Sequence, residues 1–595
     1  MKMRRTIWLT LVVVLNAVFA NVSQAHTNSC ISSTDGFWDE ARIWSLNKPP
    51  SIRQSAILIT NAASETVTID STTATHFKNT MTISNLNVAT PSGTDTLYLE
   101  NTGTTALHIL DSLIIGISFN IFGDEDPGGG ALISSNSTLI VDGLLGGQLV
   151  DDGTMVIMDG SLITTNCTLQ VGTAFAGLLI ISNSIVQARD VAVVAGESTI
   201  GTIEAVGGTM TLSSSLTVGA NTPNSQDSFL VANGGLLVVT NGETFMGGSH
   251  SGGGTMTVSN ATFLAADVGL GGVESGGALV IDNGTVTLSG QLGIGFGDIC
   301  GGSVSLSGGM LVVTNNTTTI GGDQCDGELT IEDGLFVARE IFVGFGIFAS
   351  GVLTVNGGTT QLSSNLQIGT FGGLNFGSVV VNGGQLVATN GEIMVERGAS
   401  IIVSDGLLAA KYIDLGPNFG PDGLSINGGS VTASTGITLG DCTSNTLGYV
   451  SVDGGELTVT NAAHTGFIDV QNGQLVLSNG VLQVDNLVMT NTCSSFIHTG
   501  GKLIVGSVIL DPNAFQITSV TREGNDLRVT WLMAPGQTNA LQVSSGGPHG
   551  AYTTNIFTDL FTVTNNTTAG TLTNYLDIGA ATNKPSRYYR ARLVP

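Results

Sequence analysis

Acidic side chains are the residues in this sequence with the clearest chemical potential. The 595-residue chain holds 45 Asp and Glu residues but only 18 Lys and Arg residues. A glycoside hydrolase needs two carboxylates roughly 5 to 9.5 Å apart, and a lyase needs a base with charge-neutralising partners. Asp151 and Asp152 form an adjacent pair in "LVDDGTM", but no Gly-His-Gly or Arg-x-Lys segment accompanies them. We therefore interpret this pair as a solvated turn and predict no catalytic residue.

Many of the other acids recur at one kind of position, one or two residues before a glycine. Segments that otherwise read alike carry Asn there. Asn and Asp both tolerate the left-handed backbone region and hydrogen-bond to a nearby turn, so their exchange indicates turn formation rather than proton transfer. We predict a structural ladder of turn residues, made of Asn233, Asp282, Asp333, Asn356, Asn382, Asp405, Asn427 and Asp453.

Two acidic loops have the carboxylate oxygens that a calcium ion prefers. They are "GDEDPGGG" at 123–130 and "DQCDGE" at 323–328, and neither matches an EF-hand loop or a GGxGxDx repeat. A solvated loop is the alternative interpretation of both. No other cofactor is predicted, because the 7 His residues are scattered and form no HExxH motif. The calcium candidates are Asp124, Glu125, Asp126, Asp323, Asp326 and Glu328.

One pair of cysteines stands out among the 6 in the chain, which contains no CxxC motif. Cys300 and Cys325 lie at the same place in neighbouring repeats, each nine residues before a marker glycine. Equivalent positions on stacked strands are about 4.8 Å apart, within the range of Cα separations that a disulfide accepts. A disulfide and two stacked free thiols both remain open, and neither would have a catalytic role.

The elements that position these residues are set by a repeat with a period near 24 residues. Apolar residues usually fall five and three positions before a marker glycine, and a second alternating pair follows it. A third short segment ends in an apolar residue and a glycine, as at Ile368-Gly369. Each repeat therefore predicts three short strands with a two-residue period. The marker glycines are Gly309, Gly334, Gly358, Gly384, Gly406, Gly429 and Gly455.

Three short strands in one repeat cannot bury an apolar face alone, but successive repeats stacked about 4.8 Å apart enclose a continuous core. The predicted fold class is all-β. It is a parallel β-helix with three strands and about 24 residues per rung, roughly 18 to 19 rungs in all, followed by a small C-terminal β-sandwich.

Four segments follow from composition along the chain. The basic start, apolar stretch and small-residue end of "MKMRRTIWLTLVVVLNAVFANVSQA" predict a secretory signal peptide. Trp38 and Trp44 suit a plug for the open end of the coil. The pattern changes after Leu510, where "FQITSVTREGNDLRVTWLM" predicts two strands and a tight turn. The predicted segments are 1–25 (signal peptide), 26–55 (N-terminal cap), 56–510 (β-helix) and 511–595 (β-sandwich).

Units such as "LQIGTFGGLNFGSVVVNGGQLVATNG" resemble the passenger-associated repeats of bacterial autotransporters and related secreted β-helix proteins. The early "FWDEARIWSLNKPPS" is similar to the Trp-rich opening of such passengers. The final "ATNKPSRYYRARL" resembles the last strands of fibronectin type III-like or immunoglobulin-like modules. The resemblance implies a secreted, pectin lyase-like β-helix. Nothing after Leu510 supplies the membrane-barrel strands of an autotransporter, so export with attachment or release is expected.

Charge and hydropathy bound the function. The formal net charge of -27 makes nucleic acid a poor partner, and no stretch after the signal peptide is apolar enough for a membrane helix. We predict a secreted or cell-surface protein with a structural or adhesive role, which contacts glycans or surface proteins weakly at many points. The alternatives are a polysaccharide lyase or glycoside hydrolase on a pectate-lyase-like β-helix, and a non-catalytic glycan-binding module. The sequence leaves the oligomeric state open.

Overall fold

The computed structural model divides into two compact units. Unit 1 comprises Met1–Asn316 and Cys325–Gly327, and unit 2 comprises Thr317–Gln324 and Glu328–Pro595. The structure describes residues 27–62, 64–90, 93–119, 125–127, 129–143, 148–150, 153–172, 175–195, 200–219, 227–248, 252–297, 299–369, 376–396, 398–416, 421–443, 446–491, 493–510, 517–534, 536–545, 557–567, 570–582 and 586–594.

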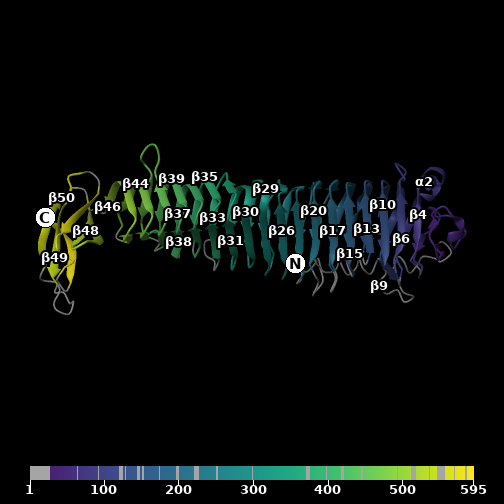
Figure 1. The fold of residues 1–595 in the computed structure, drawn as a ribbon, viewed down its shortest axis with the longest axis horizontal. Helices are drawn as coiled ribbons and strands as arrows, with labels where there is room; N and C mark the ends of the chain where they lie inside the picture. The colour runs from purple at the N-terminus through teal and green to yellow at the C-terminus, as the bar shows by residue number, and fades with distance from the viewer. Residues whose placement is uncertain are drawn as a thin grey trace. The chain divides into compact units, whose positions relative to one another are not determined.

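Unit 1 is a parallel β-solenoid with three sheets (Figure 1). Its first sheet contains β2 (Gly36–Phe37), β4 (Thr66–Ile69), β6 (Asp95–Glu100), β10 (Gly130–Ser135), β13 (Gly153–Met158), β15 (Gly177–Ser182), β17 (Gly201–Val206), β20 (Ser228–Asn233), β23 (Gly254–Ser259) and β26 (Gly276–Asp282). Its second sheet contains β11 (Thr138–Val141), β18 (Thr209–Leu212), β21 (Leu236–Val239), β24 (Thr262–Ala265) and β27 (Thr285–Leu288). Its third sheet contains β1 (Thr27–Ser29), β3 (Ala56–Ile59), β12 (Gln148–Val150), β19 (Leu216–Val218), β22 (Glu243–Met246), β25 (Asp267–Leu270) and β28 (Leu292–Ile294).

Longer strands of unit 1 turn a corner and so contribute to two sheets. They are β5 (Thr82–Val88), β7 (Leu107–Ile115), β14 (Ser161–Val171), β16 (Ile185–Val193) and β29 (Gly301–Ile320). The short elements outside the three sheets are the 3-10 helices η2 (Ala41–Ile43) and η3 (Lys78–Thr80), the helix α2 (Ser71–His76) and the antiparallel pair β8 (Ile117–Phe119) and β9 (Glu125–Pro127).

Unit 2 repeats the same architecture. Its first sheet contains β31 (Ser350–Val355), β34 (Phe376–Val381), β36 (Ser400–Val403), β38 (Pro421–Ile426), β40 (Leu447–Val452), β43 (Gly473–Leu477) and β45 (Ser494–His498). The second sheet includes β32 (Thr359–Leu362) and β41 (Glu456–Val459), and the third includes β33 (Leu366–Ile368) and β42 (Phe467–Val470). Strands that turn the corner between these two sheets are β35 (Gln385–Val395), β37 (Leu407–Leu415), β39 (Ser430–Leu439), β44 (Val481–Met489) and β46 (Lys502–Leu510). The long β30 (Asp326–Val343) also turns this corner, pairing with β32 and β33, and its first residues precede the second sheet.

The predicted all-β class and parallel β-helix are confirmed, since 66% of residues lie in strands and 2% in helices. Within the coil, a strand pairs in parallel with the equivalent strands of the rungs before and after it. Leu132 pairs with Leu97 and Met155 in unit 1, and Val379 pairs with Leu353 and Ile401 in unit 2. Such pairing stacks equivalent residues of successive rungs in columns. Each rung therefore needs apolar residues at the same positions, which is why the sequence repeats.

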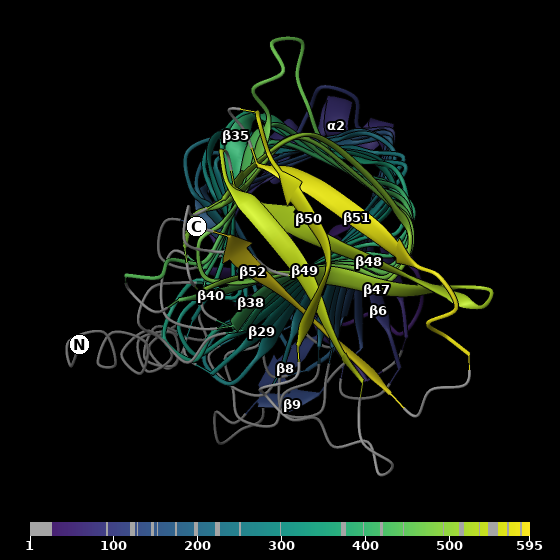
Figure 2. The same cartoon turned by 90° about the vertical axis from the view of Figure 1, so that its left-hand side faces the viewer.

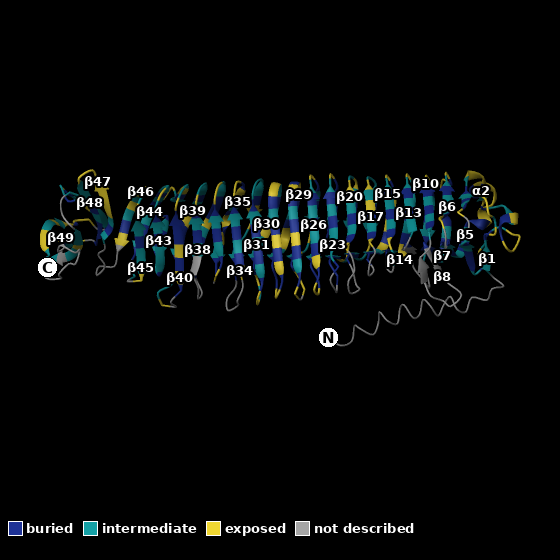
Figure 3. Cartoon of the chain, turned by 60° about the horizontal axis from the view of Figure 1, so that its bottom comes forward, coloured by how far each residue is buried: buried dark blue, intermediate teal, exposed yellow. Residues whose placement is uncertain are grey.

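Alternate residues of each strand point into the coil, where Leu, Ile and Val are almost completely buried (Figure 3). The corners need unusual backbone angles. Gly429 has φ +62°, and a Cβ there would lie 2.6 Å from the carbonyl oxygen of Gly406 on the neighbouring rung. Asn136 adopts φ 46° at a corner of unit 1, as its tolerance of the left-handed region allows.

The rungs are fewer than predicted, at about 17 turns, because the first ones are long. Asp95 pairs with Gly130, a step of 35 residues, whereas Gly130 pairs with Gly153 after 23. The pair β8 and β9 lies within the long step. The period of the middle repeats therefore does not extend to the N-terminal rungs.

The first strands already belong to the coil. Within the segment predicted as a cap, β1 pairs in parallel with β3 and β2 with β4. Trp38 and Trp44 are buried, with ring centroids 5.3 Å apart in an edge-on arrangement. The indole N–H of Trp38 donates to the Thr80 carbonyl, and that of Trp44 donates to the Trp38 carbonyl. These tryptophans thus fill the first rungs. The predicted signal peptide lies outside the described residues.

The C-terminal part of unit 2 contains two three-stranded antiparallel sheets (Figure 2). Val529, Trp531, Met533 and Leu541 form their common core, against which Phe561 and other half-buried side chains from both sheets pack. The first sheet is β47 (Ile517–Glu523), β48 (Asp526–Met533) and β51 (Thr571–Asp577), and the second is β50 (Thr558–Thr564), β49 (Thr538–Ser545) and β52 (Arg587–Val594).

Candidate functional site

Acidic and aromatic side chains gather on the outer face of the third sheet of unit 2. Strands β35, β37, β39 and β42 place two register rows side by side. These side chains face outward because their neighbours in the strands, such as Ile413 and Ile437, fill the core. The first row is Glu392, Tyr412, Gly436 and Phe467, and the second is Met394, Asp414, Thr438 and Asp469. We call these residues the carboxylate and aromatic face.

The two aromatic rings share one apolar patch across a missing side chain. Their centroids are 6.3 Å apart and their planes are tilted by 52°. A Cβ on Gly436, which lies between them in the row, would be 2.7 Å from ring atoms of Phe467. The ring of Phe467 therefore occupies the space above Gly436. The Tyr412 hydroxyl and the Thr438 hydroxyl are 2.5 Å apart and hydrogen-bonded, which holds the Tyr412 ring in place.

The electrostatics of the face come from carboxylates on neighbouring strands. Burial raises the pKa of Asp414, and the charge of Glu392 raises it further. Burial also raises the pKa of Tyr412, and the charges of Asp414, Glu392 and Asp469 add to that effect, while the Thr438 hydrogen bond opposes it. The face therefore favours a proton or another cation.

These acids differ from the acids that the sequence singled out, because they lie on strands and not in turns. Glu392 is exposed, whereas Asp414 and Asp469 are half-buried. The amide of Gln471 donates to Asp469 Oδ2 over 2.8 Å. Lys411, the cation that precedes Tyr412, is exposed at the corner where the β37 register shifts. The arrangement can stack one apolar ring face and bind cationic or hydroxyl groups at its edge.

A second group of acids is buried near the N-terminal end of unit 1. Asp95 is 0% exposed and Glu65 is 3% exposed, and both oxygens of Asp95 lack a hydrogen-bond partner. Thr66 pairs with Thr96, which makes these acids neighbours on successive rungs. Burial, which is the larger cause, and the charge of Glu65 together raise the pKa of Asp95 to about 7. Burial and then a hydrogen bond with Glu65 raise the pKa of the Cys30 thiol to about 12, so it is not a thiolate nucleophile at neutral pH.

The predicted turn-ladder residues occupy two different positions, one at the end of the strand of the first sheet and one a residue later. Asp333 and Asp405 are at the later position, and each accepts a hydrogen bond from the amide of the following glycine. The side chains at the strand end bond along the coil instead, as Asn382 does to Asn356 over 2.9 Å. The register places six of the eight at this strand end: Asn233, Asp282, Asn356, Asn382, Asn427 and Asp453.

The predicted calcium residues lie in separate surroundings. In unit 2, Asp323 accepts a hydrogen bond from the Ile347 amide, and Glu328 accepts one from the Thr330 hydroxyl. In unit 1, the amide of Asp326 donates to the Cys300 carbonyl. Among the described residues, no group of three or more His, Cys, Asp or Glu side chains is arranged to hold a metal ion. Calcium binding stays a prediction.

Some of the predicted residues cannot be placed. Asp124, Asp151 and Asp152 lie outside the described residues. Glu125 and Asp126 belong to β9, but their side chains are outside the described part.

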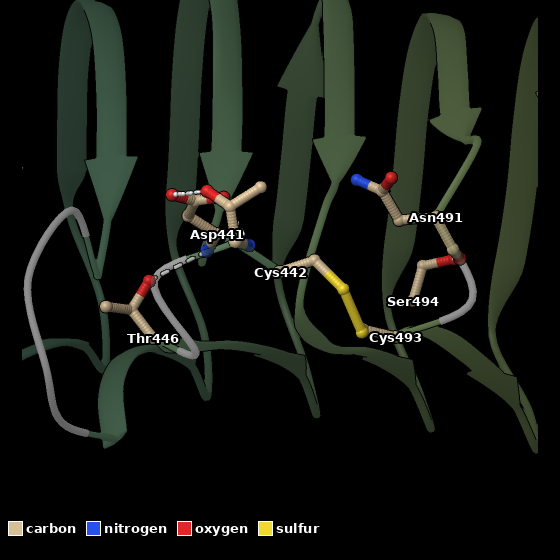
Figure 4. The surroundings of a disulfide bond; sticks show 7 residues. Asp441, Cys442, Thr446, Asn491, Cys493 and Ser494 are labelled. Atoms are coloured by element: carbon tan, nitrogen blue, oxygen red, sulfur yellow. Dashed lines mark hydrogen bonds between the residues drawn. A yellow bond between two sulfur atoms is a disulfide. The ribbon is translucent and has the colours of Figure 1, made fainter.

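Two disulfides join the rungs of the coil. One links Cys300 and Cys325 in unit 1, with a Cα separation of 4.7 Å. The other, which the sequence pattern did not predict, links Cys442 and Cys493 in unit 2 (Figure 4). Cys442 precedes β40 and Cys493 precedes β45, so this bond crosses the intervening rung at its short Gln471–Asn472 turn. Cys30 and Cys167 are buried thiols.

The carboxylate and aromatic face was also missed by sequence reasoning. Its residues are scattered over more than 70 positions, from Glu392 to Asp469. Other rungs carry acids or aromatic rings at such outward positions too, such as Glu243, Phe245 and Phe342. The available signal was therefore the sequence of Tyr412, Gly436 and Phe467 at equivalent positions of successive repeats, and not the residue types alone.

The comparisons with known proteins add no relative. No protein-family model matches the chain, and no curated protein matches it. None of the helices in the described part of the chain has both the length and the apolar character needed to span a membrane.

Proposed function

We propose that this protein is an extracellular structural or adhesive β-solenoid whose extended polar surface makes weak multivalent contacts with glycans or proteins. The observation that carries this proposal is the alternation of outward positions along the strands. They include Thr255, Thr257 and Ser259 on β23, and Ser430, Thr432 and Ser434 on β39. Hydroxyl groups therefore recur at every second residue of such a strand, about 7 Å apart, and in places also on the neighbouring rung, as where Thr262 pairs with Thr285.

Such a surface binds through many weak contacts and not through one deep pocket. A single hydroxyl contact is worth about 1 kcal/mol or less, which alone gives no useful affinity. Many such contacts on one rigid coil act together, because binding at one point holds the next at a high effective concentration. Stacked parallel strands provide the rigidity, since each rung is hydrogen-bonded to both of its neighbours.

Export through the predicted signal peptide belongs to the same proposal. Disulfides persist in oxidising compartments, and two join rungs of the coil. Expression of the full chain in a secreting host, followed by N-terminal sequencing of the released protein, tests this step. A new N-terminus at residue 26 supports it, and retention of Met1 in the cytoplasm contradicts it.

The function is tested by presenting glycans and extracellular proteins at two surface densities. We expect binding that rises more steeply than density, because several contacts must form together. Binding that is equal per ligand at both densities contradicts the multivalent mode. Absence of binding to every glycan and protein contradicts the adhesive function itself.

A carbohydrate-active enzyme is the second candidate, and Glu392 with Asp414 is the observation in its favour. Burial raises the pKa of Asp414, which makes it the better suited of the two to give a proton to a leaving group, while Glu392 can act as base or nucleophile. The test is release of reducing ends from polysaccharides by the wild-type protein, Asp414→Asn and Glu392→Gln. Glu456→Gln, on the second sheet of the same unit, is the control. Release that both site variants retain contradicts this pair as the catalytic site, and no release at all contradicts the enzyme.

A further inference from the structure

We propose that the carboxylate and aromatic face of unit 2 is a binding site for a saccharide ring that carries a protonated amino group. This inference rests on the proposed function, because it names the kind of glycan that one part of the surface takes. Three features of the face support it, which are the apolar patch, the charges around it and the area that a ligand can cover.

The first feature is the aromatic patch, which suits the face of a pyranose ring. One side of such a ring presents C–H groups, and these pack on aromatic faces much as apolar side chains do. Tyr412 and Phe467 lie with centroids 6.3 Å apart over Gly436. Their polar neighbours, Thr438 and the Tyr412 hydroxyl, are bonded to each other, so the rings are held in place before a ligand arrives.

The glycine has a structural role as well. A ring packed on a glycine in the adjacent strand shields its backbone, and Phe245 over Gly269 in unit 1 is a second example. In that case two acids, Glu243 and Asp267, lie in the adjoining row, and Asp267 already accepts a hydrogen bond from the Gln291 amide. Shielding therefore accounts for one aromatic ring over a glycine, and the face of unit 2 differs from this example by its second ring, Tyr412, and by a third carboxylate.

The second feature is charge complementarity. The two outward rows carry three carboxylates, and no Lys, Arg or His belongs to either row. Lys411 is exposed at the adjoining corner and is the cation nearest in the chain to Tyr412. An ammonium group placed beside Asp414 and Glu392 relieves their mutual repulsion and forms charge-assisted hydrogen bonds. A sugar acid would add to the repulsion instead.

The third feature is size. Tyr412 and Phe467 lie on strands two rungs apart, with Gly436 between them in the row and ring centroids 6.3 Å apart. The shared patch is therefore about the area of one sugar ring, which makes the site weak by itself. A chain of amino sugars would extend beyond the patch along the sheet, where Asn486 and Ser507 continue the row of Phe467 on the next rungs.

The experiment measures binding of the full chain to an immobilised glucosamine hexasaccharide and to its fully N-acetylated counterpart. The two probes share the ring faces and differ in charge. The wild-type protein should bind the cationic probe at least about tenfold more tightly, and the preference should shrink as salt is raised. Phe467→Ala and Asp414→Asn should each weaken binding to the cationic probe by about tenfold.

Two matched controls belong to the same experiment. Tyr449→Ala removes an exposed aromatic ring from the first sheet of unit 2, and Glu456→Gln removes an exposed acid from its second sheet. Neither should change binding. Tyr412→Phe keeps the ring if Phe467→Ala fails to fold, and it should retain most of the affinity while Asp414→Asn does not.

The outcomes separate this inference from the proposed function. Equal binding of the two probes overturns the preference for an amino group. Binding that Phe467→Ala and Asp414→Asn leave unchanged overturns this site, while the adhesive surface stands. If the chain binds other glycans or proteins but neither hexasaccharide, the inference also fails alone. Absence of binding to every surface overturns both.

Discussion

Asp95 offers a direct test of how burial in this coil controls charge. The change is Asp95→Asn, which keeps the shape of the side chain and removes the carboxylate. Asp95 points inward from β6 in the same column as Gly130, so no solvent reaches it. Its nearest carboxyl neighbour is Glu65 on the preceding rung. The nearby backbone amides of Asn61 and Glu65 offset the rise in pKa only partly, because neither forms a full hydrogen bond with the carboxylate.

The magnitude follows from the two protonation states. The pKa of Asp95 rises from 3.8 in the unfolded chain to about 7 in the folded one. Below about pH 4 both states hold the proton, so Asp95 costs nothing. Between about pH 4 and 7 the unfolded state releases the proton while the folded state keeps it, and stability falls as pH rises. Above about pH 7 both states are ionised, and the difference corresponds to a cost of about 4 kcal/mol.

We expect the variant to recover about half of this cost as added stability. The side-chain amide that the substitution introduces also lacks hydrogen-bond partners, and an end of the coil can open locally without full unfolding. Asp95→Asn should therefore stabilise the protein by about 2 kcal/mol at pH 8 and by about zero at pH 4. The gain should appear progressively between these two pH values.

The assay is urea unfolding at pH 4, 6 and 8, followed by tryptophan fluorescence. Trp38 and Trp44 are buried in the first rungs and report on this end of the coil. A Trp531→Phe background removes the signal of the C-terminal module. Glu100→Gln is the control, because it removes a carboxylate from the other end of the same strand. A difference between Asp95→Asn and wild type that is the same at all three pH values would refute the reasoning.

Three further predictions concern unit 1 and unit 2. Cys442→Ser should destabilise unit 2 by about 4 kcal/mol, because the bond closes a 51-residue separation. Its urea midpoint should fall below that of the oxidised wild type and should coincide with that of the wild type when both are reduced, whereas an unchanged midpoint under oxidising conditions would show that the two thiols are free. Burial opposes ionisation of Asp190, but Arg189 and the Ser215 amide outweigh it and lower the pKa to about 2, so the stability it adds above pH 4 is lost as pH falls toward 2. Discounted for solvent screening, Asp190→Asn should cost about 1 kcal/mol at pH 7 in urea unfolding and nothing at pH 2, and an equal cost at both would contradict this. Gly436→Ala should displace the Phe467 ring, because the added Cβ would lie 2.7 Å from ring atoms. Binding of glucosamine hexasaccharide should weaken, while the thermal unfolding temperature changes little. Unchanged binding would show that the position of the Phe467 ring does not matter for the ligand.

The coil was predictable because its cause is local and repeated. Inward pairs such as Val379 and Val381 alternate with outward residues, and the same pattern returns at each rung. Glycine at corners such as Gly429 follows from backbone angles that a Cβ opposes. Each of these patterns lies within a few residues of sequence, and it recurs once in every rung.

The sites were harder to predict because they depend on irregular corners. The β-strand pairing shifts between Ala388 and Glu392, and the segment between β41 and β42 lengthens one rung, so a 24-residue period cannot align Glu392 with Phe467. Cys442 and Cys493 lie close to two periods apart, which was a usable signal. A bond across two rungs also requires the turn between them to be short, and the period contains no such information.

The same physics explains why an unusual outward residue in this fold is informative. Residues at inward positions are selected by packing in the core, where any Leu, Ile or Val that fits is suitable. Outward positions on a solenoid strand carry little of the folding free energy, so Ser or Thr serves there at no cost. A large aromatic ring such as Phe467, half-exposed and requiring a glycine on the next strand, constrains two rungs at once. Together with three acids on the same face, that constraint is better explained by a ligand than by the stability of the coil.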